Sequence, residues 1–320
     1  MESSSRRELV VTLGPASVAA IGALASAGAT AFRLNASHLG LDELVTWLER
    51  VRSEAPDVPV VVDLQGAKMR VGDFAARPVK RDALVRFALA PRAADDVPLP
   101  HRELVDQVRP GEVLSCDDGR LRCEVERAGD GVVVARWLSD GVLSPRKGIN
   151  RAEHPVSCTG LSERDAAQVA AALRFGRVSF AWSFVLDGRE AEWLRRAAPG
   201  CPVIGKVERA EAVTHIERIH AAVDTTWICR GDLGAQLGAL KLADFVSVYR
   251  PPQTGTPVLM AGQVLQHLAS HPEPTRSEVC HLFDLLRRGY AGIVLSDETA
   301  VGVAPVESTW TARRLLDELG

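Results

Sequence analysis

Short apolar runs rich in β-branched residues alternate with longer amphipathic stretches along most of the chain. The runs have the length of strands, and the stretches between them have helical spacing. Several stretches begin at Ser or Asp and end at Gly, which are common helix start and stop signals. The predicted strands are 8–13, 29–34, 58–63, 178–183, 202–206, 225–229, 256–260 and 291–295, and the main predicted helices are 17–28, 41–52, 162–176, 189–198, 210–222 and 277–289.

Strands that alternate with helices form parallel βαβ units, because each helix carries the chain back to the start of the next strand. Eight such units favour closure into a ring over an open sheet. The pattern therefore predicts an α/β protein built on a (β/α)8 TIM barrel.

The alternation is interrupted once, between Arg70 and about Lys147. Short alternating runs at 83–90, 111–116, 119–126 and 130–137 lie there, with Asp-Gly or Gly-Asp pairs at 118–119, 129–130, 130–131 and 140–141. This pattern is typical of antiparallel hairpins. We predict a small inserted β-barrel-like lid domain at 71–147, in the third βα loop, and a catalytic TIM barrel at 1–70 and 148–320. Removing these 77 residues from 320 leaves 243, which is close to the roughly 250 residues of a typical barrel.

Composition narrows the class of protein. A hydrophobic content of 46% excludes general disorder, and a formal charge of −3 argues against a nucleic-acid partner. The six cysteines form no CxxC pair, so we read them as reduced thiols of a cytoplasmic protein. The apolar stretch near the start is too short for a signal peptide or a membrane span, so we expect no membrane partner.

Charged residues gather where several predicted strands end. In barrel enzymes the active site forms at the carboxyl ends of the strands. Any one of these residues alone could be a solvated loop residue, but scattered surface charges have no reason to choose the same end of every strand. The residues are Arg33, Asn35 and Ser37 around the end of strand two, Asp63 at the end of strand three, Lys206 and Glu208 at the end of strand five, and Arg230, Gly231 and Asp232 after strand six.

These charged residues at the strand ends favour a narrow range of reactions. Glu208 and Asp232 are hard oxygen ligands suited to Mg²⁺ or Mn²⁺. Arg33 offers a fork for phosphate, and Lys206 is a point charge that can stabilise a transferring phosphoryl group or an enolate. The set predicts phosphoryl transfer or chemistry on a pyruvate-like enolate.

The motifs of the chain resemble those of the pyruvate kinase family, in the family's order. That family has a barrel with a β-rich lid domain in the third βα loop, which agrees with the division predicted from the hydrophobic pattern. The similar motifs are VVTLGPAS, FRLNASH, VDLQGAKMRVG, RKGIN, LSERD, GKVERAE, CRGDLGAQLG, PEPTRSEV and LSDETAVGVAPVES, which span residues 10–308.

This resemblance implies an Mg²⁺-dependent enzyme that passes a phosphoryl group between phosphoenolpyruvate, or a related enolpyruvate, and ADP. Lys206, Arg33 and Lys68 would be catalytic, and Glu208 and Asp232 would hold the metal. Gly231, Asp232 and Gly262 would bind substrate, with backbone N–H groups at a helix start favouring its carboxylate. Asn35, Arg70 and Lys147 would bind the nucleotide, and closure of the lid would exclude water.

Potassium-dependent members of the family hold a monovalent cation at positions equivalent to Asn35, Ser37, Asp63 and Leu64. They carry Glu where this chain has Lys68. The resemblance is to the potassium-independent branch, in which the Lys ammonium takes the electrostatic role of the ion, so we expect K⁺ not to be required. The alternative is that Lys68 is a solvent-facing loop residue.

Three features depart from the family pattern. Gly262 stands where the family usually has Thr, which predicts weaker activity on phosphoenolpyruvate or a pocket for a bulkier substrate. The chain ends just after the eighth predicted helix, so we expect no C-terminal allosteric domain and a homodimer formed through barrel helices. Cys229 stands at an Ala position, and we interpret it as a buried small residue because no His partner is apparent.

Two other functions stay open at this stage. One is an Mg²⁺-dependent lyase or aldolase that acts on a pyruvate-like 2-oxo acid without a nucleotide, as Gly262 suggests. The other is a non-catalytic ligand-binding homologue. The intact set of charged residues at the strand ends argues against the second.

Overall fold

The computed structural model describes residues 6–117 and 119–319. The chain forms two compact units. The first comprises the residues up to Gln65, Gly160–Gly234 and those from Ala239 onward, and the second comprises Gly66–Thr159 with Ala235–Gly238.

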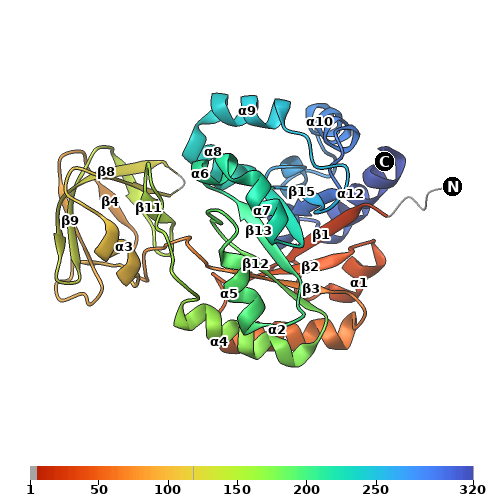
Figure 1. Ribbon diagram of the computed structural model, residues 1–320, viewed down its shortest axis with the longest axis horizontal. Coiled ribbons are helices and arrows are strands. Elements are labelled where there is room, and N and C mark those ends of the chain that lie inside the picture. Colours follow the sequence, from red (N-terminus) through yellow and green to blue (C-terminus); the bar gives the residue numbers. More distant parts are fainter. Residues whose placement is uncertain (1–5, 118, 320) are drawn as a thin grey trace. The chain divides into compact units, whose positions relative to one another are not determined.

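Eight parallel strands of the first unit close into a barrel, which confirms the predicted fold class. The barrel order is β1-β16-β15-β14-β13-β12-β3-β2. Barrel strands that follow one another along the chain are therefore adjacent in the barrel, and the last strand, β16, closes the ring against β1. The strands lie at the centre of this unit, with the helices outside them (Figure 1). The strands are β1 (Glu8–Leu13), β2 (Ala31–Asn35), β3 (Val60–Leu64), β12 (Val178–Trp182), β13 (Val203–Val207), β14 (Thr225–Cys229), β15 (Val258–Ala261) and β16 (Gly292–Leu295).

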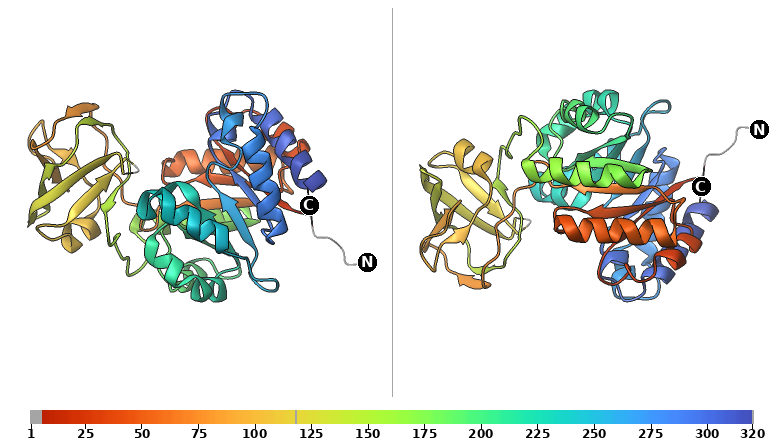
Figure 2. Two further views of the ribbon diagram at one scale, coloured as in Figure 1. Left: turned by 90° about the horizontal axis from the view of Figure 1, so that it is seen from above. Right: turned by 90° about the horizontal axis from the view of Figure 1, so that it is seen from below.

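The helices of this unit surround the strands, and α2 and α4 lie side by side (Figures 1 and 2). The helix predicted at 210–222 is divided at His215 into two shorter ones. Helix α10 begins with a reciprocal capping box between Thr275 and Glu278. The helices are α1 (Ile21–Ser26), α2 (Leu41–Glu54), α4 (Glu163–Ala172), α5 (Glu190–Ala197), α6 (Ala210–Thr214), α7 (Ile216–Ala222), α8 (Arg230–Leu237), α9 (Ala239–Val248), α10 (Arg276–Arg287), α11 (Asp297–Ala300) and α12 (Pro305–Leu319), with 3₁₀ turns η1 (Leu173–Phe175) and η2 (Gln266–Ala269).

Side chains inside the barrel follow the two-residue period of the strands. A layer of apolar side chains fills the middle of the barrel, and charged side chains follow it toward the carboxyl ends. The apolar layer consists of Val10, Val61, Ala181, Ile204, Trp227, Cys229, Leu259, Ala261 and Val294. The site described below is therefore built on a packed floor.

The second unit is a β-domain inserted between β3 and α4, as the sequence predicts. Its larger sheet has the order β11-β7-β8-β9-β5-β6, and β10 pairs with β4 in a separate ribbon. Asp130 and Gly131 join β8 to β9 with φ of 50° and 76°, as a type I′ turn requires. The elements are β4 (Arg77–Val79), β5 (Leu84–Ala88), β6 (Val97–Pro98), α3 (Arg102–Gln107), β7 (Val113–Cys116), β8 (Leu121–Gly129), β9 (Val132–Trp137), β10 (Gly141–Leu143) and β11 (Ile149–Arg151).

The limits of this unit differ from the 71–147 segment expected from the hairpin pattern. Met69, Ile149 and Val156 lie outside that segment but belong to the hydrophobic core of the unit. The unit therefore begins earlier and ends later, because the connecting segments bury apolar side chains in it. The turn predicted at 118–119 includes residue 118, which is outside the described residues.

In the part of the chain that the structure covers, no helix combines the length and the apolar character needed to cross a bilayer.

Candidate active site

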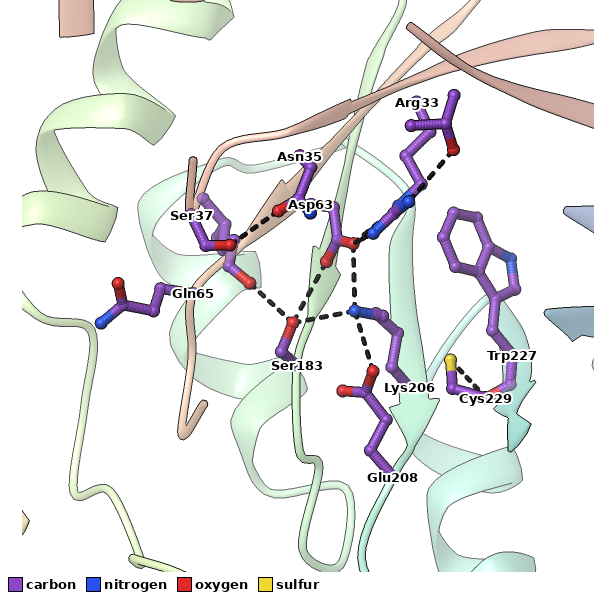
Figure 3. A network of polar contacts seen from close by, with 12 residues as sticks. Arg33, Asn35, Ser37, Asp63, Gln65, Ser183, Lys206, Glu208, Trp227 and Cys229 are labelled. Carbon is purple, nitrogen blue, oxygen red and sulfur yellow. Dashed lines mark hydrogen bonds and ion pairs between the residues drawn. The ribbon is translucent and has the colours of Figure 1, made fainter. Parts of the chain in front are cut away.

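A network of buried charged side chains lies at the carboxyl ends of three barrel strands, two of which are neighbours while β12 separates them from the third. Arg33 comes from β2, Asp63 from β3, and Lys206 from β13, with Glu208 just after β13. All four side chains point toward one another inside the barrel (Figure 3). The charges of two carboxylates and two cations cancel, which lowers the free-energy cost of burying these side chains together.

Asp63 is the centre of this network. Its Oδ2 accepts from Arg33 Nε at 2.7 Å and lies 2.6 Å from Arg33 Nη2 and 3.0 Å from Lys206 Nζ. Burial by itself raises the pKa of the Asp63 carboxyl, but the charges of Lys206 and Arg33 outweigh it and hold that pKa below its ordinary value. Asp63 is therefore a carboxylate at neutral pH.

Lys206 has an acceptor for each of its three N–H groups. Asp63 Oδ2 lies 3.0 Å from Nζ, Glu208 Oε1 lies 3.1 Å away, and Ser183 Oγ lies 2.9 Å away. Burial by itself lowers the pKa of the Lys206 ammonium. The charges of Asp63 and Glu208 raise this pKa by more than burial lowers it, so the net shift is upward. The side chain is a fixed positive charge and not a base.

Ser183 completes the network and was not among the predicted site residues. Its hydroxyl accepts from Lys206 and faces two acceptors of its own, the Leu64 carbonyl oxygen at 2.8 Å and Asp63 Oδ1 at 3.2 Å. A signal was present in the sequence, because Ser183 is the polar last residue of the predicted strand 178–183.

Arg33 is held in place from both sides. Its Nη1 donates to Thr12 Oγ1 at 3.0 Å, and Thr12 in turn donates to the Leu295 carbonyl oxygen at 2.6 Å. A guanidinium has five N–H donors, so the contacts with Thr12 and Asp63 leave donors for an incoming oxyanion. Thr12 is a second residue that the sequence reasoning did not select.

Asn35 and Ser37 lie near Asp63 (Figure 3), and Leu64 follows Asp63 at the end of β3. The resemblance predicts the equivalent of a monovalent-cation site at these residues. The Ser37 hydroxyl donates to Asn35 Oδ1 at 2.7 Å. Arg164 donates to the backbone carbonyl of Ser37 at 3.1 Å. The geometry brings these oxygens to the same end of β2 and β3.

Glu208 and Asp232 are the predicted metal ligands. Glu208 Oε2 accepts from the backbone N–H of Phe184 at 2.8 Å. Burial raises the pKa of the Cys229 thiol well above its ordinary value, and the charges of Glu208 and Asp232 act on that thiol in the same direction. The Cys229 thiol therefore stays protonated at neutral pH.

This pair of hard oxygen donors fits Mg²⁺ or Mn²⁺, which bind one or two carboxylates and take their other ligands from water and substrate. Among residues 6–117 and 119–319, no group of three or more His, Cys, Asp and Glu side chains is arranged to hold a metal. An ion here would need substrate oxygens to complete its coordination.

Gly231 and Gly262 face each other where β14 and β15 end. Gly262 has a φ of +77°, and a Cβ built on it would lie 3.3 Å from the Gly231 backbone nitrogen. Arg230 donates to the Gly262 carbonyl oxygen at 3.0 Å and also to that of Gln263. Glycine at 262 thus keeps side-chain atoms away from the first amide groups of α8.

Lys68, Arg70 and Lys147 belong to the second unit. Lys147 Nζ lies 2.9 Å from Asp117 Oδ1, and Arg70 Nη1 donates to the Arg146 carbonyl oxygen at 3.0 Å. Their roles in nucleotide binding and catalysis stay predictions.

Comparison with known proteins gives consistent results. A family model described as pyruvate kinase, barrel domain, matches residues 4–309. A pyruvate kinase of Methylorubrum extorquens is 32% identical, with the alignment covering 100% of this chain and 70% of the relative. A pyruvate kinase of Haemophilus influenzae is 32% identical, and the alignment covers 95% of this chain and 68% of the relative. Pyruvate kinase II of Salmonella typhimurium is 31% identical, and the alignment covers 97% of this chain and 69% of the relative. The similarity includes the barrel and the inserted β-domain.

Proposed function

Because this chain belongs to the pyruvate kinase family, we propose that it catalyses Mg²⁺-dependent phosphoryl transfer between phosphoenolpyruvate, or a related enolpyruvate, and ADP. The observation that carries the proposal is the buried network of Arg33, Asp63, Lys206 and Glu208 at the carboxyl ends of the barrel strands. Fixed charges in a site with little water stabilise a transferring phosphoryl group more strongly than they would in water.

Lys206 acts on the charge that moves between the phosphoryl and enolate oxygens. Its ammonium can turn one N–H from Ser183 or Glu208 toward a substrate oxygen while it keeps the contact with Asp63. The raised pKa keeps it charged throughout the reaction. Such a preorganised cation needs no reorientation when the charge develops.

Arg33 and the start of α8 orient the substrate. The remaining Arg33 donors suit a phosphoryl oxygen, because Asp63 and Thr12 fix the guanidinium plane. The backbone N–H groups of Gly231 and Asp232 suit a carboxylate, since the first amides of a helix have no partner within the helix.

Glu208 and Asp232 would hold the metal. Mg²⁺ supplies positive charge that neutralises substrate phosphate and enolate oxygens. Arg70 and Lys147 of the β-domain would bind the nucleotide together with Asn35, and Lys68 would take the electrostatic role of a monovalent cation. Closure of the β-domain would exclude water that could otherwise accept the phosphoryl group.

A second candidate rests on Gly262. The positive φ at this position and the 3.3 Å approach to Gly231 suit glycine and disfavour the Thr usual in the family. A site without that hydroxyl is compatible with an Mg²⁺-dependent lyase that acts on a 2-oxo acid without a nucleotide. Retro-aldol cleavage, or exchange of pyruvate methyl protons, in the absence of ADP would support this candidate over the kinase.

The test of the kinase proposal is ATP formation from phosphoenolpyruvate and ADP with Mg²⁺. Replacement of Lys206 by Met should lower kcat by about 10³-fold, the scale for loss of one preorganised charge donor. Lys241, an exposed lysine on α9, provides the matched control, and Lys241→Met should keep full activity. A folded unmutated protein that makes no ATP, under conditions where a known pyruvate kinase does, would contradict the proposal.

A further inference from the structure

A cavity of about 460 Å³ opens at the amino-terminal end of the barrel, opposite the end that carries the charged network. It is lined by residues that lie just before the starts of the strands or among the first three residues of a strand. Small-molecule sites have volumes of roughly 300 to 1,000 Å³, so this cavity has room for a ligand of a few to about a dozen heavy atoms.

The inner wall of the cavity is apolar. Val10, Val61, Ile204 and Trp227 line it, and all four belong to the apolar layer in the middle of the barrel. This layer separates the cavity from the charged site, and Trp227 pairs in register with Lys206 on the neighbouring strand. The cavity is therefore distinct from the proposed active site although the two share a wall.

Glu8 is the carboxylate of the cavity. Within the described residues, its side chain has no hydrogen bond or ion pair. Burial raises the pKa of the Glu8 carboxyl above its ordinary value. The proposed phosphoryl transfer uses neither this side chain nor the cavity.

The other charged residue of the lining already has a partner. Arg177 Nη2 lies 3.5 Å from Asp57 Oδ1, and Arg177 Nη1 donates to the Asp57 carbonyl oxygen at 3.2 Å. A half-buried carboxylate without a partner, in a cavity that is also lined by an aromatic ring and aliphatic side chains, is an environment that suits an organic ammonium.

We propose that this cavity is a second ligand site, which binds a small primary amine whose ammonium pairs with Glu8 and whose apolar body packs against Trp227. The apolar body displaces water from the inner wall, and the ammonium supplies the donors that Glu8 lacks. An alcohol of the same shape has one neutral donor in place of three charged ones, and a carboxylate would repel Glu8. The site thus selects for positive charge. This inference does not depend on the proposed phosphoryl transfer.

The test uses the full chain and three probes of matched shape: phenethylamine, 2-phenylethanol and 3-phenylpropionate. Binding is followed by tryptophan fluorescence and by the thermal unfolding midpoint, and Trp227→Phe assigns the fluorescence signal. The amine should bind at least about tenfold more tightly than the alcohol, as a charged hydrogen bond implies. The carboxylate should bind most weakly.

Variants then locate the site. Glu8→Gln should weaken amine binding about tenfold and leave alcohol binding unchanged, because it removes only the charge. Glu49→Gln, at an exposed carboxylate on α2, is the matched control and should change nothing. Ala31→Leu, which adds bulk to the lining, should weaken both the amine and the alcohol.

The proposal is overturned if the amine and the alcohol bind equally, if the carboxylate binds most tightly, or if none of the probes binds at tens of millimolar. It is also overturned if either Glu8→Gln or Ala31→Leu leaves amine binding unchanged. Since Glu8→Gln removes an unpaired half-buried charge, the variant should fold at least as stably as the unmutated protein.

Discussion

The ammonium of Lys206 lies 3.0 Å from Asp63 Oδ2, with 6% and 1% of the two side chains exposed. This pair holds opposite charges in place inside the barrel, where few water molecules can screen them. Arg33 and Ser183 contact the same carboxylate, so Asp63 fixes the position of the cation that the proposed reaction uses.

Removal of the Asp63 charge should make the free energy of unfolding vary less with pH in the acid range. The depressed pKa of Asp63 means that its ionised form stabilises the native state above the ordinary carboxyl pKa of about 3.9, and that this contribution is lost as the pH falls toward the folded-state value. Asp63→Asn should cost about 3 to 5 kcal/mol at pH 7, because it leaves buried cations unpaired.

The measurement is the free energy of unfolding in denaturant between pH 3 and pH 7. The difference between the unmutated protein and Asp63→Asn should shrink as the pH falls below about 4. Asp57→Asn, at a side chain that is 92% exposed, is the control and should give a nearly constant difference. A constant difference for Asp63→Asn as well would show that Asp63 does not titrate as described.

Ser183 should position the Lys206 ammonium. Ser183→Ala removes the acceptor 2.9 Å from Nζ and should lower kcat about tenfold with little change in KM, because orientation matters most in the transition state. Ser179→Ala changes the same residue type on β12 and should leave the kinetics unchanged. An equal loss in both variants would indicate general destabilisation.

Gly262 should be sensitive to any added side chain. Ala at φ +77° is strained by about 1 to 2 kcal/mol, and its Cβ would press on the Gly231 amide proposed to bind the substrate carboxylate. We expect Gly262→Ala to lower the free energy of unfolding by about that amount and to raise KM for phosphoenolpyruvate. The control is Gly40→Ala, since a Cβ at Gly40 meets nothing within 4 Å.

Lys68 is expected to replace a monovalent cation. Initial rates with and without K⁺, in a buffer of tetramethylammonium salts, should be equal for the unmutated protein. Lys68→Glu should create a requirement for K⁺, because it restores the acidic side chain of potassium-dependent relatives. Lys80→Glu, at an exposed lysine of the β-domain, is the control. Strong activation of the unmutated protein by K⁺ would contradict this prediction.

The sequence by itself determined the eight barrel strands, the place of the inserted β-domain and the charged residues that end the strands. Strands such as 8–13 and 225–229 match the structure at both limits, because a buried parallel strand needs a continuous apolar run of limited length. Arg33, Asp63 and Lys206 could be selected in the same way, since the carboxyl ends of barrel strands meet at one end of the barrel.

The tertiary structure decided which of these charges pair. The sequence put Lys68 next to Asp63 along the chain, whereas in the barrel Arg33 and Lys206 neutralise Asp63 from the two sides. The contact of Ser183 with Lys206, the approach of Gly262 to Gly231 and the cavity at Glu8 likewise depend on distances between residues in or next to different strands. The two-residue period of a strand determines whether a side chain points into the barrel. Which side chains it contacts there is determined only by the closure of the barrel and the stagger of its strands.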